Sequence, residues 1–166
     1  MDGSTKIKLS RILIVGFFFS IILFSDNVTV EFYGNDTPEF KGVQYGRMYL
    51  TTHRMIFNSK SPSEPLRSFS FPFVTLEDVA VEQPMFSANY IKGKVHAQPS
   101  GNFIGEVKFK IVFKSGGAIE FGQAMLKAAH LGMYLLHCFG IVPRSWLSSP
   151  PLTIQPILLV LKKSET

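Results

Sequence analysis

The residues that could support catalysis or metal binding are scattered along the chain. The four histidines are His53, His96, His130 and His137, and the single cysteine is Cys138. His137 and Cys138 are neighbours, but no second pair at metal-ligand spacing completes a zinc site. One cysteine also excludes an internal disulfide framework. We therefore expect the histidines to be structural or solvated, and we expect no metal.

The acidic residues and the glycines form no catalytic pattern either. Asp26, Glu77 and Asp78 have no partner at a spacing that general acid–base chemistry would need. Gly42 and Gly46 stand singly rather than in a phosphate-binding loop, and the chain has no nucleophile elbow. The sequence therefore predicts a protein that is not an enzyme and that uses no cofactor.

Lysines are the chemically useful residues that do fall into a pattern. Lys92 and Lys94 alternate within one predicted strand, and Lys108, Lys110 and Lys114 alternate within another. If these two strands form a hairpin, both rows lie on the same outer face. The rows are then either a solubilising face or a patch that binds an anionic lipid or an acidic partner. Among aromatic residues only Tyr90 accompanies them, so the pattern does not favour direct nucleic-acid binding.

The second lysine row belongs to a stretch that predicts a strand, a turn and a helix in succession. Residues 105–113 alternate apolar and polar side chains, which is typical of a half-buried strand. Ser115-Gly116-Gly117 then turns the chain, because paired glycines accept positive φ. Residues 118–121 can return as a short strand, and from Glu120 onward the apolar spacing is helical. The stretch predicts a sheet that ends in one helix packed over it.

Period-two patterns recur along the rest of the chain. They cover residues 28–33, 44–51, 53–58, 69–73, 76–83 and 90–97. Pro72 indicates that segment 69–73 is an edge strand of the sheet or that the proline lies at the end of its strand, because proline cannot donate to a sheet ladder. Short strands closed by one helix indicate an α+β protein built as a small antiparallel barrel or curved sandwich.

Length and composition allow one domain with appendages. The chain has 166 residues, of which 46% are hydrophobic, and this is enough for a sizeable core. Its net charge of +5 permits contact with anionic lipid or nucleic acid but is only a weak bias. Residues 131–142 are apolar around most of a helical wheel, and the prolines that follow interrupt any further element. We expect residues 131–166 to form no separate domain.

The beginning of the chain permits several interpretations. A basic start precedes an apolar run at residues 12–24. As a helix this run would be about 20 Å long, against a hydrocarbon core of about 30 Å. It could be a signal peptide or anchor, in which case the sequons at Asn27 and Asn35 would matter. It could also be an apolar leader that continues into a buried strand.

Three stretches of the predicted strands resemble one family. They are GRMYLTTHRMIF at 46–57, QPMFSANYIKG at 83–93 and GGAIEFGQ at 116–123. They look like the GRAM domain of the WW domain-binding protein 2 family, which includes the postacrosomal sheath WW domain-binding protein. Residues 20–28 also resemble the start of that domain. The resemblance divides the chain into an unmatched leader at 1–19, a GRAM domain at 20–130 and a tail at 131–166.

The resemblance implies a pleckstrin-homology-like fold, a seven-stranded curved antiparallel barrel capped by a C-terminal helix. It also implies a non-enzymatic intracellular adaptor of the nucleus and cytoplasm, acting in transcription coactivation and signalling. The implied partners are transcription regulators and WW-domain proteins, the latter bound through Pro-Pro-x-Tyr motifs. This sequence has only Pro150-Pro151-Leu152-Thr153, without the tyrosine that would fill the WW groove. It looks like a variant that lacks the proline-rich tail, which puts WW binding in doubt.

One alternative function remains open. The apolar run at 12–24 and the lysine rows also suit a membrane-associated GRAM module that binds anionic lipids or phosphoinositides. If Ile21 to Phe24 enter the first strand of the domain, however, cleavage near Ser25 would remove part of that strand. This argues against a signal peptide and makes the two sequons coincidental.

Overall fold

The computed structural model of the protein describes residues 21–138 and residue 140. Several predicted features lie outside the described residues: the leader at 1–19, most of the apolar run at 12–24, the end of the apolar stretch at 131–142, and the Pro-Pro pair at 150–151.

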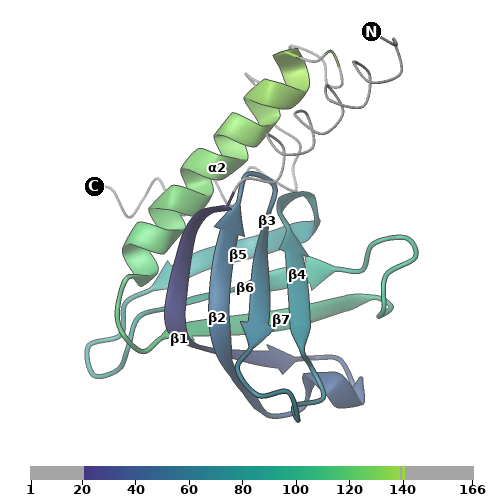
Figure 1. The fold of residues 1–166 in the computed structure, drawn as a ribbon, viewed down its shortest axis with the longest axis vertical. Helices are drawn as coiled ribbons and strands as arrows, with labels where there is room; N and C mark the ends of the chain where they lie inside the picture. Colours follow the sequence, from purple (N-terminus) through teal and green to yellow (C-terminus); the bar gives the residue numbers. More distant parts are fainter. Residues whose placement is uncertain (1–20, 139, 141–166) are drawn as a thin grey trace, which may run out of the picture.

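Seven antiparallel strands and one long helix make up the described part of the chain (Figure 1). The strands are β1 (Ile21–Tyr33), β2 (Val43–Thr51), β3 (Arg54–Ser59), β4 (Ser68–Pro72), β5 (Leu76–Glu82), β6 (Tyr90–His96) and β7 (Glu106–Phe113). Two short 3-10 helices, η1 (Pro38–Phe40) and η2 (Phe73–Thr75), lie in the connections, and α2 (Ala118–Cys138) follows the last strand. The spatial order is β4-β3-β2-β1-β7-β6-β5. This confirms the predicted seven-stranded antiparallel fold with its C-terminal helix, and the edge position of the strand that contains Pro72.

β1 joins the two halves of the sheet. Its first part pairs only with β2, Val28 to Glu31 pair with both β2 and β7, and its last two residues pair only with β7. The register shifts between Ser25 and Val28, and Asn27 there has a φ of 54°. A bulge of this kind bends a strand and increases its twist. β1 can therefore pass from the front group of strands to the group behind it (Figure 1), which curves the sheet into a barrel.

Phenylalanine rings fill the interior of this barrel. Phe71 is completely buried, and its ring centroid lies 4.7 Å from that of Phe69 and 4.9 Å from that of Phe109. Phe32, on β1, stacks on Phe71 at 6.1 Å. Along β7 the residues predicted to face inward are all buried: Val107, Phe109, Ile111 and Phe113. The period-two pattern therefore identified the inner face correctly, and the lysines between these residues face outward.

The prediction of a short strand at 118–121 is wrong, because α2 begins at Ala118. β7 already pairs with β1 on one edge and with β6 on the other, so no edge is free for a returning strand. Gly116 and Gly117 both have positive φ and redirect the chain, and the Phe121 amide donates to the Gly117 carbonyl at 2.9 Å. The helix then packs its buried face, which includes Phe121 and Met125, over the end of the barrel.

α2 continues beyond the predicted end of the domain at residue 130 and crosses the turn between β2 and β3. A Cβ at Gly132 would lie 2.7 Å from the carbonyl oxygen of Thr52, so this close approach needs glycine. Leu131 beside it is 48% exposed. Among the helices in the described part of the chain, none has the length and apolarity needed to cross a membrane.

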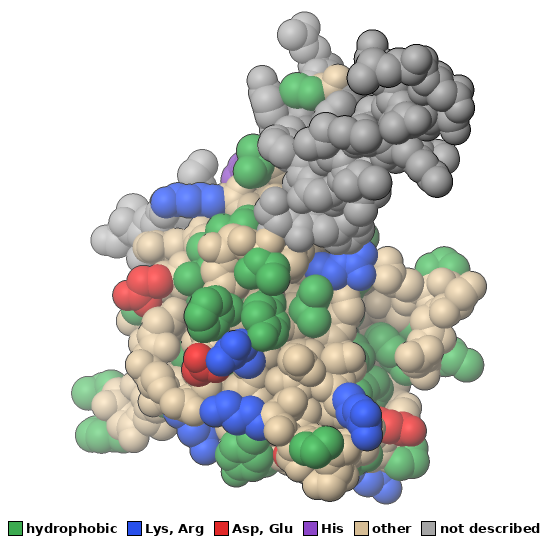
Figure 2. Space-filling view, viewed as in Figure 1, with side chains coloured by type: hydrophobic (Ala, Val, Ile, Leu, Met, Phe, Trp, Pro, Cys, Tyr) green, Lys and Arg blue, Asp and Glu red, His purple; other side chains and the backbone are tan. Residues whose placement is uncertain are grey.

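Residues Ile21 to Phe24 lie in β1, as expected if the family resemblance extends to them, but they do not form a buried strand. Ile21 is 62% exposed and Phe24 is 54% exposed. Nothing described covers the outer face of the sheet here, and Figure 2 shows hydrophobic side chains gathered on the face formed by the front strands. The Arg47 guanidinium lies 5.0 Å from the centre of the Phe24 ring and pairs with Asp26 at 2.5 Å. This cation covers part of the exposed ring.

Candidate functional site

The outer face of β6 and β7 carries a shallow groove of about 370 Å³. β1 contributes Tyr33 to one side of it, and β5 contributes Asp78 to the other. Its lining residues are Tyr33, Asp78, Tyr90, Lys92, Gly93, Lys94, Lys108, Phe109 and Lys110. Four of the five lysines that the sequence singled out therefore meet in one place, which we call the lysine groove.

Strand register brings these four lysines together. Lys92 is directly opposite Lys110, and Lys94 is directly opposite Lys108. Like charges directly opposite one another destabilise a sheet unless other groups compensate them. The compensation comes from β5, where Glu82 accepts from the Lys92 ammonium at 2.7 Å and Asp78 accepts from the Lys94 ammonium at 2.8 Å. The hydrogen bond to Glu82 raises the pKa of Lys92, and the one to Asp78 raises the pKa of Lys94.

The two lysines on β7 have different surroundings. Among the described residues, no carboxylate lies within ion-pair distance of Lys108 or Lys110. The Lys110 ammonium instead lies 4.8 Å from the centre of the Tyr90 ring. A cation over an aromatic face gains about 0.5–1 kcal/mol at an exposed site, but it keeps its positive charge. Lys108 and Lys110 are therefore the cations available to a ligand.

Tyr33 closes the groove beside Lys108, its partner across the β1–β7 ladder. Its hydroxyl donates a hydrogen bond to Glu31, two residues earlier on the same face of β1. That hydrogen bond, with a smaller contribution from burial, raises the pKa of Tyr33 to about 12. Tyr33 is therefore a neutral donor at physiological pH, and Glu31, which is opposite Lys110 across the β1–β7 ladder, accepts its hydrogen bond.

The fifth predicted lysine, Lys114, does not belong to the groove. It lies one residue beyond β7 and lines a separate hollow together with Lys60, Asn27 and Tyr45. Its ammonium lies 4.8 Å from the centre of the Tyr45 ring. The alternation along residues 108–114 suggested one continuous row. The chain leaves the sheet before Lys114, so the row is divided between two places.

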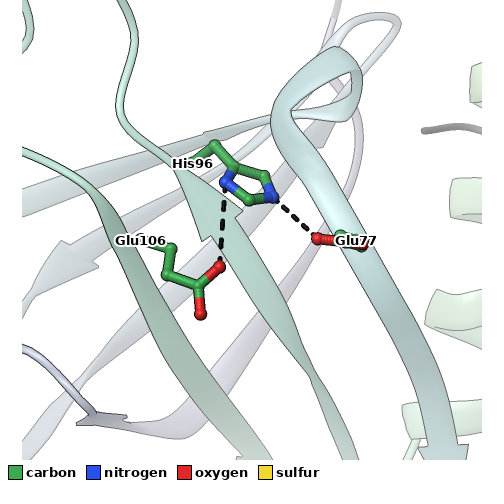
Figure 3. Close-up of side chains that lie close together, drawn as sticks. All are labelled: Glu77, His96 and Glu106. Carbon is green, nitrogen blue, oxygen red and sulfur yellow. Dashed lines mark hydrogen bonds and ion pairs between the residues drawn. The ribbon is translucent and has the colours of Figure 1, made fainter.

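His96 lies at the end of β6, between two carboxylates (Figure 3). Its Nε2 is 2.8 Å from an oxygen of Glu77 on β5, and its Nδ1 is 3.9 Å from an oxygen of Glu106 on β7. One suitable ligand atom from each residue can be chosen so that all three lie within 4.8 Å of one another. The carboxylates face opposite nitrogens of the ring, however, so they do not converge on one point as the ligands of a single ion must. The arrangement suits an imidazole that bridges three strands.

Sequence reasoning missed the acidic partners of this face. Glu77, Asp78 and Glu82 have no counterpart at a recognisable spacing in the chain, because their partners lie on the neighbouring strand. Asp78 is also at a register irregularity of β5, with a φ of 52°, so simple alternation does not predict its direction. The sequence does contain a signal, since acidic residues recur in 77–82 and lysines recur in 92–94. These residues can be recognised as ion-pair partners only when β5 is known to pair with β6.

Comparison with known protein families gives a match that spans the whole sheet. Residues 19–131 match the GRAM domain. The chain belongs to the GRAM domain family. This confirms the resemblance seen in the three sequence stretches, and the match covers all seven strands and the first part of α2.

Relatives of this GRAM domain are named as binding proteins. WW domain-binding protein 2 of Rattus norvegicus and that of Homo sapiens are each 46% identical over 114 residues, which is 66% of this chain and 42% of each relative. The postacrosomal sheath WW domain-binding protein of Macaca fascicularis is 48% identical over 91 residues, 54% of this chain and 36% of the relative. This chain therefore spans less than half the length of these relatives.

A solved structure of a pleckstrin-homology domain gives a weak match. The Vps36 N-terminal PH domain superposes with a TM-score of 0.49 at 16% identity, covering 72% of this chain and 83% of that one. The pleckstrin-homology-like class of this GRAM domain follows from its own seven antiparallel strands and capping helix.

Proposed function

We propose that this GRAM domain is a non-enzymatic adaptor that binds an acidic segment of a partner protein in the lysine groove. Its proposed place of action is the nucleus and cytoplasm, in transcription coactivation and signalling. The observation that carries the proposal is the pair of uncompensated cations, Lys108 and Lys110, in a groove edged by Tyr33 and Tyr90.

The groove offers both kinds of contact that a short acidic segment needs. Carboxylates of the partner would accept hydrogen bonds from the Lys108 and Lys110 ammonium groups, which are stronger than bonds between neutral groups. Apolar parts of the segment would lie on the rings of Tyr33 and Tyr90. A volume of about 370 Å³ is within the range of small ligand sites, so it holds a few side chains and not a folded domain.

The charge around the groove favours a protein partner over a bare membrane. The acidic residues of this face are Glu31, Glu77, Asp78, Glu82 and Glu106, which stand beside four lysines. A membrane presents an extended negative surface. Its anionic headgroups would attract the lysines but would also be repelled by these carboxylates. A peptide can place its carboxylates on Lys108 and Lys110 alone, and mixed charge gives specificity of this kind.

The names of the relatives support a role in protein binding. WW domain-binding protein 2 is named for its binding to WW domains. Here the Pro-Pro pair at 150–151 is followed by Leu152 and Thr153, without the tyrosine of a Pro-Pro-x-Tyr motif. We therefore assign partner binding by this chain to the groove rather than to a WW ligand.

Charge reversal tests the proposal. Binding of a fluorescein-labelled peptide rich in Asp and Glu, with one aromatic residue, is followed by fluorescence anisotropy on the full chain. We expect Lys108→Glu with Lys110→Glu to weaken binding at least about tenfold, which corresponds to about 1.4 kcal/mol. The matched control is Lys41→Glu with Lys127→Glu, which makes the same change in net charge at two other exposed lysines. Equal affinity of the two double variants would reject the groove as the binding site.

The second candidate is the headgroup of an anionic lipid or phosphoinositide in the same groove. It is favoured by Lys108 and Lys110, whose uncompensated charges could both contact one phosphate. The same two double variants are compared by flotation with phosphoinositide vesicles. If vesicles bind through Lys108 and Lys110 while the acidic peptide does not bind at all, the lipid function replaces the adaptor function.

A further inference from the structure

The loop between β5 and β6 presents two adjacent, almost completely exposed hydrophobic side chains. Met85 is 90% exposed and Phe86 is 96% exposed. Figure 1 shows this loop projecting from the barrel, and Figure 2 shows hydrophobic side chains standing out on the same side of the molecule. Residues 83–89 carry no charged side chain, and Pro84 restricts the backbone before the pair. We call Met85 and Phe86 the hydrophobic tip.

Single exposed hydrophobic residues are common, so exposure alone carries no argument. The tip differs because its two large side chains are consecutive and because the base of its loop lies at the end of β7 where uncompensated cations gather. The carbonyl of Asn89, at the base of the loop, accepts from the Phe113 amide at 3.2 Å. The residue after Phe113 is Lys114, so the loop base and this lysine lie at the same end of β7.

Lys60 joins Lys114 at this end of the sheet. Asn27 links them, since its side chain accepts from the Lys60 ammonium at 3.0 Å and donates to the Ser115 hydroxyl at 3.0 Å. Within the described ranges, no carboxylate lies at ion-pair distance from Lys60 or Lys114. Tyr45, half exposed, lies beside the Lys114 ammonium. The tip is therefore accompanied by two available cations and an amphipathic aromatic ring.

We propose that the hydrophobic tip inserts into the surface of an anionic lipid bilayer, with Lys60 and Lys114 contacting the headgroups. Apolar side chains in the interfacial layer and basic residues at headgroup level are the two components of peripheral membrane binding. Tyr45 suits the same boundary, because its ring is apolar and its hydroxyl is polar. The contact uses none of the residues that line the lysine groove, so it stands whichever ligand the groove takes.

Vesicle binding of the full chain tests this contact. Phosphatidylcholine vesicles with and without phosphatidylserine are compared by flotation. Met85→Ser with Phe86→Ser should lower binding to the anionic vesicles at least about tenfold, and Lys60→Gln with Lys114→Gln should weaken binding and reduce its dependence on salt. Ile104→Ser is the matched control, since Ile104 is 92% exposed in the β6–β7 loop at the opposite end of β6. It should bind as the unmodified chain does.

A spectroscopic readout reports on the tip directly. Phe86→Trp in a Trp146→Phe background places the single tryptophan of the chain at the tip. On addition of anionic vesicles we expect its emission to shift to the blue and to be quenched by brominated acyl chains. An unchanged spectrum would overturn the proposal, as would equal losses of vesicle binding in the Ile104→Ser and tip variants. It would also be overturned if the tip variant floated normally while losing a protein partner, because the tip would then be a protein contact.

Discussion

Lys92 and Lys94 differ from Lys108 and Lys110 in what their ammonium groups contact, although all four face the same groove. The β6 lysines are held by carboxylates of β5, whereas Lys110 lies over Tyr90 and Lys108 has no acidic partner among the described residues. Alternation in the sequence predicted which way these side chains point, because strand period alone decides that. It could not predict which lysines are compensated, since that depends on strand order and register.

Tyr33 allows a titration that tests this arrangement residue by residue. The hydrogen bond to Glu31 raises the pKa of Tyr33 to about 12, so Glu31→Gln should lower this pKa toward the ordinary value of about 10. The measurement is an ultraviolet pH titration, with Tyr33→Phe subtracted to remove the other tyrosines. A pKa that stays unchanged in Glu31→Gln would contradict the assignment.

The same shifts fix the sign of the pH dependence of folding. A group whose pKa is raised in the folded state binds its proton more tightly there, so its contribution to stability is complete below the unfolded pKa. The pKa values of Tyr33, Lys92 and Lys94 are all raised in the folded state. Their contribution to stability is therefore lost as the pH rises above about 10. These groups should therefore leave stability unchanged near neutral pH.

At the scale of elements, α2 is the part that local sequence described least well. Its first residues, Ala118 to Phe121, are compatible with a strand when they are considered alone. They are helical because β7 has no free edge, and this is a property of the sheet order rather than of the segment. The hairpin between β2 and β3 was predicted correctly, because both of its strands are adjacent in the chain.

Helix docking can be tested at Gly132. Gly132→Ala should gain helix propensity of about 0.5–1 kcal/mol in an unconstrained helix. Here the added Cβ would lie 2.7 Å from the Thr52 carbonyl oxygen, so we expect a net destabilisation of about 1–3 kcal/mol, as in an overpacked core.

Urea denaturation measures this change, and Leu131→Ala, at the half-exposed neighbouring position, is the control that should change stability by less than about 0.5 kcal/mol. Gly132→Ala with increased stability would mean that α2 does not approach the β2–β3 turn this closely.

At the scale of the whole molecule, the family resemblance anticipated the fold more completely than any local pattern did. It implied the seven-stranded barrel and the capping helix, and both are present. The barrel depends on the bulge at Asn27, where β1 passes between the two halves of the sheet. No spacing in the sequence announces that bulge, because an asparagine at positive φ is recognisable only once the partners of the strand are known.

The assignment of partner binding to the groove has a consequence for WW domains. This sequence should not bind an isolated WW domain through Pro150-Pro151-Leu152-Thr153, because no tyrosine is present to fill the aromatic-lined groove. Thr153→Tyr should create measurable binding in a calorimetric titration, and adding Pro151→Ala should abolish it. Tight binding by the unmodified chain would show that another segment is a WW ligand.

The most direct test of the adaptor proposal is an NMR titration of the full chain with the acidic peptide. We expect saturable chemical-shift changes in the amides of β6 and β7 that surround Lys92, Lys94, Lys108 and Lys110, and we expect Lys108→Glu with Lys110→Glu to remove them. Saturable changes confined to other strands, or changes that persist in this double variant, would contradict the assignment of the lysine groove as the binding site.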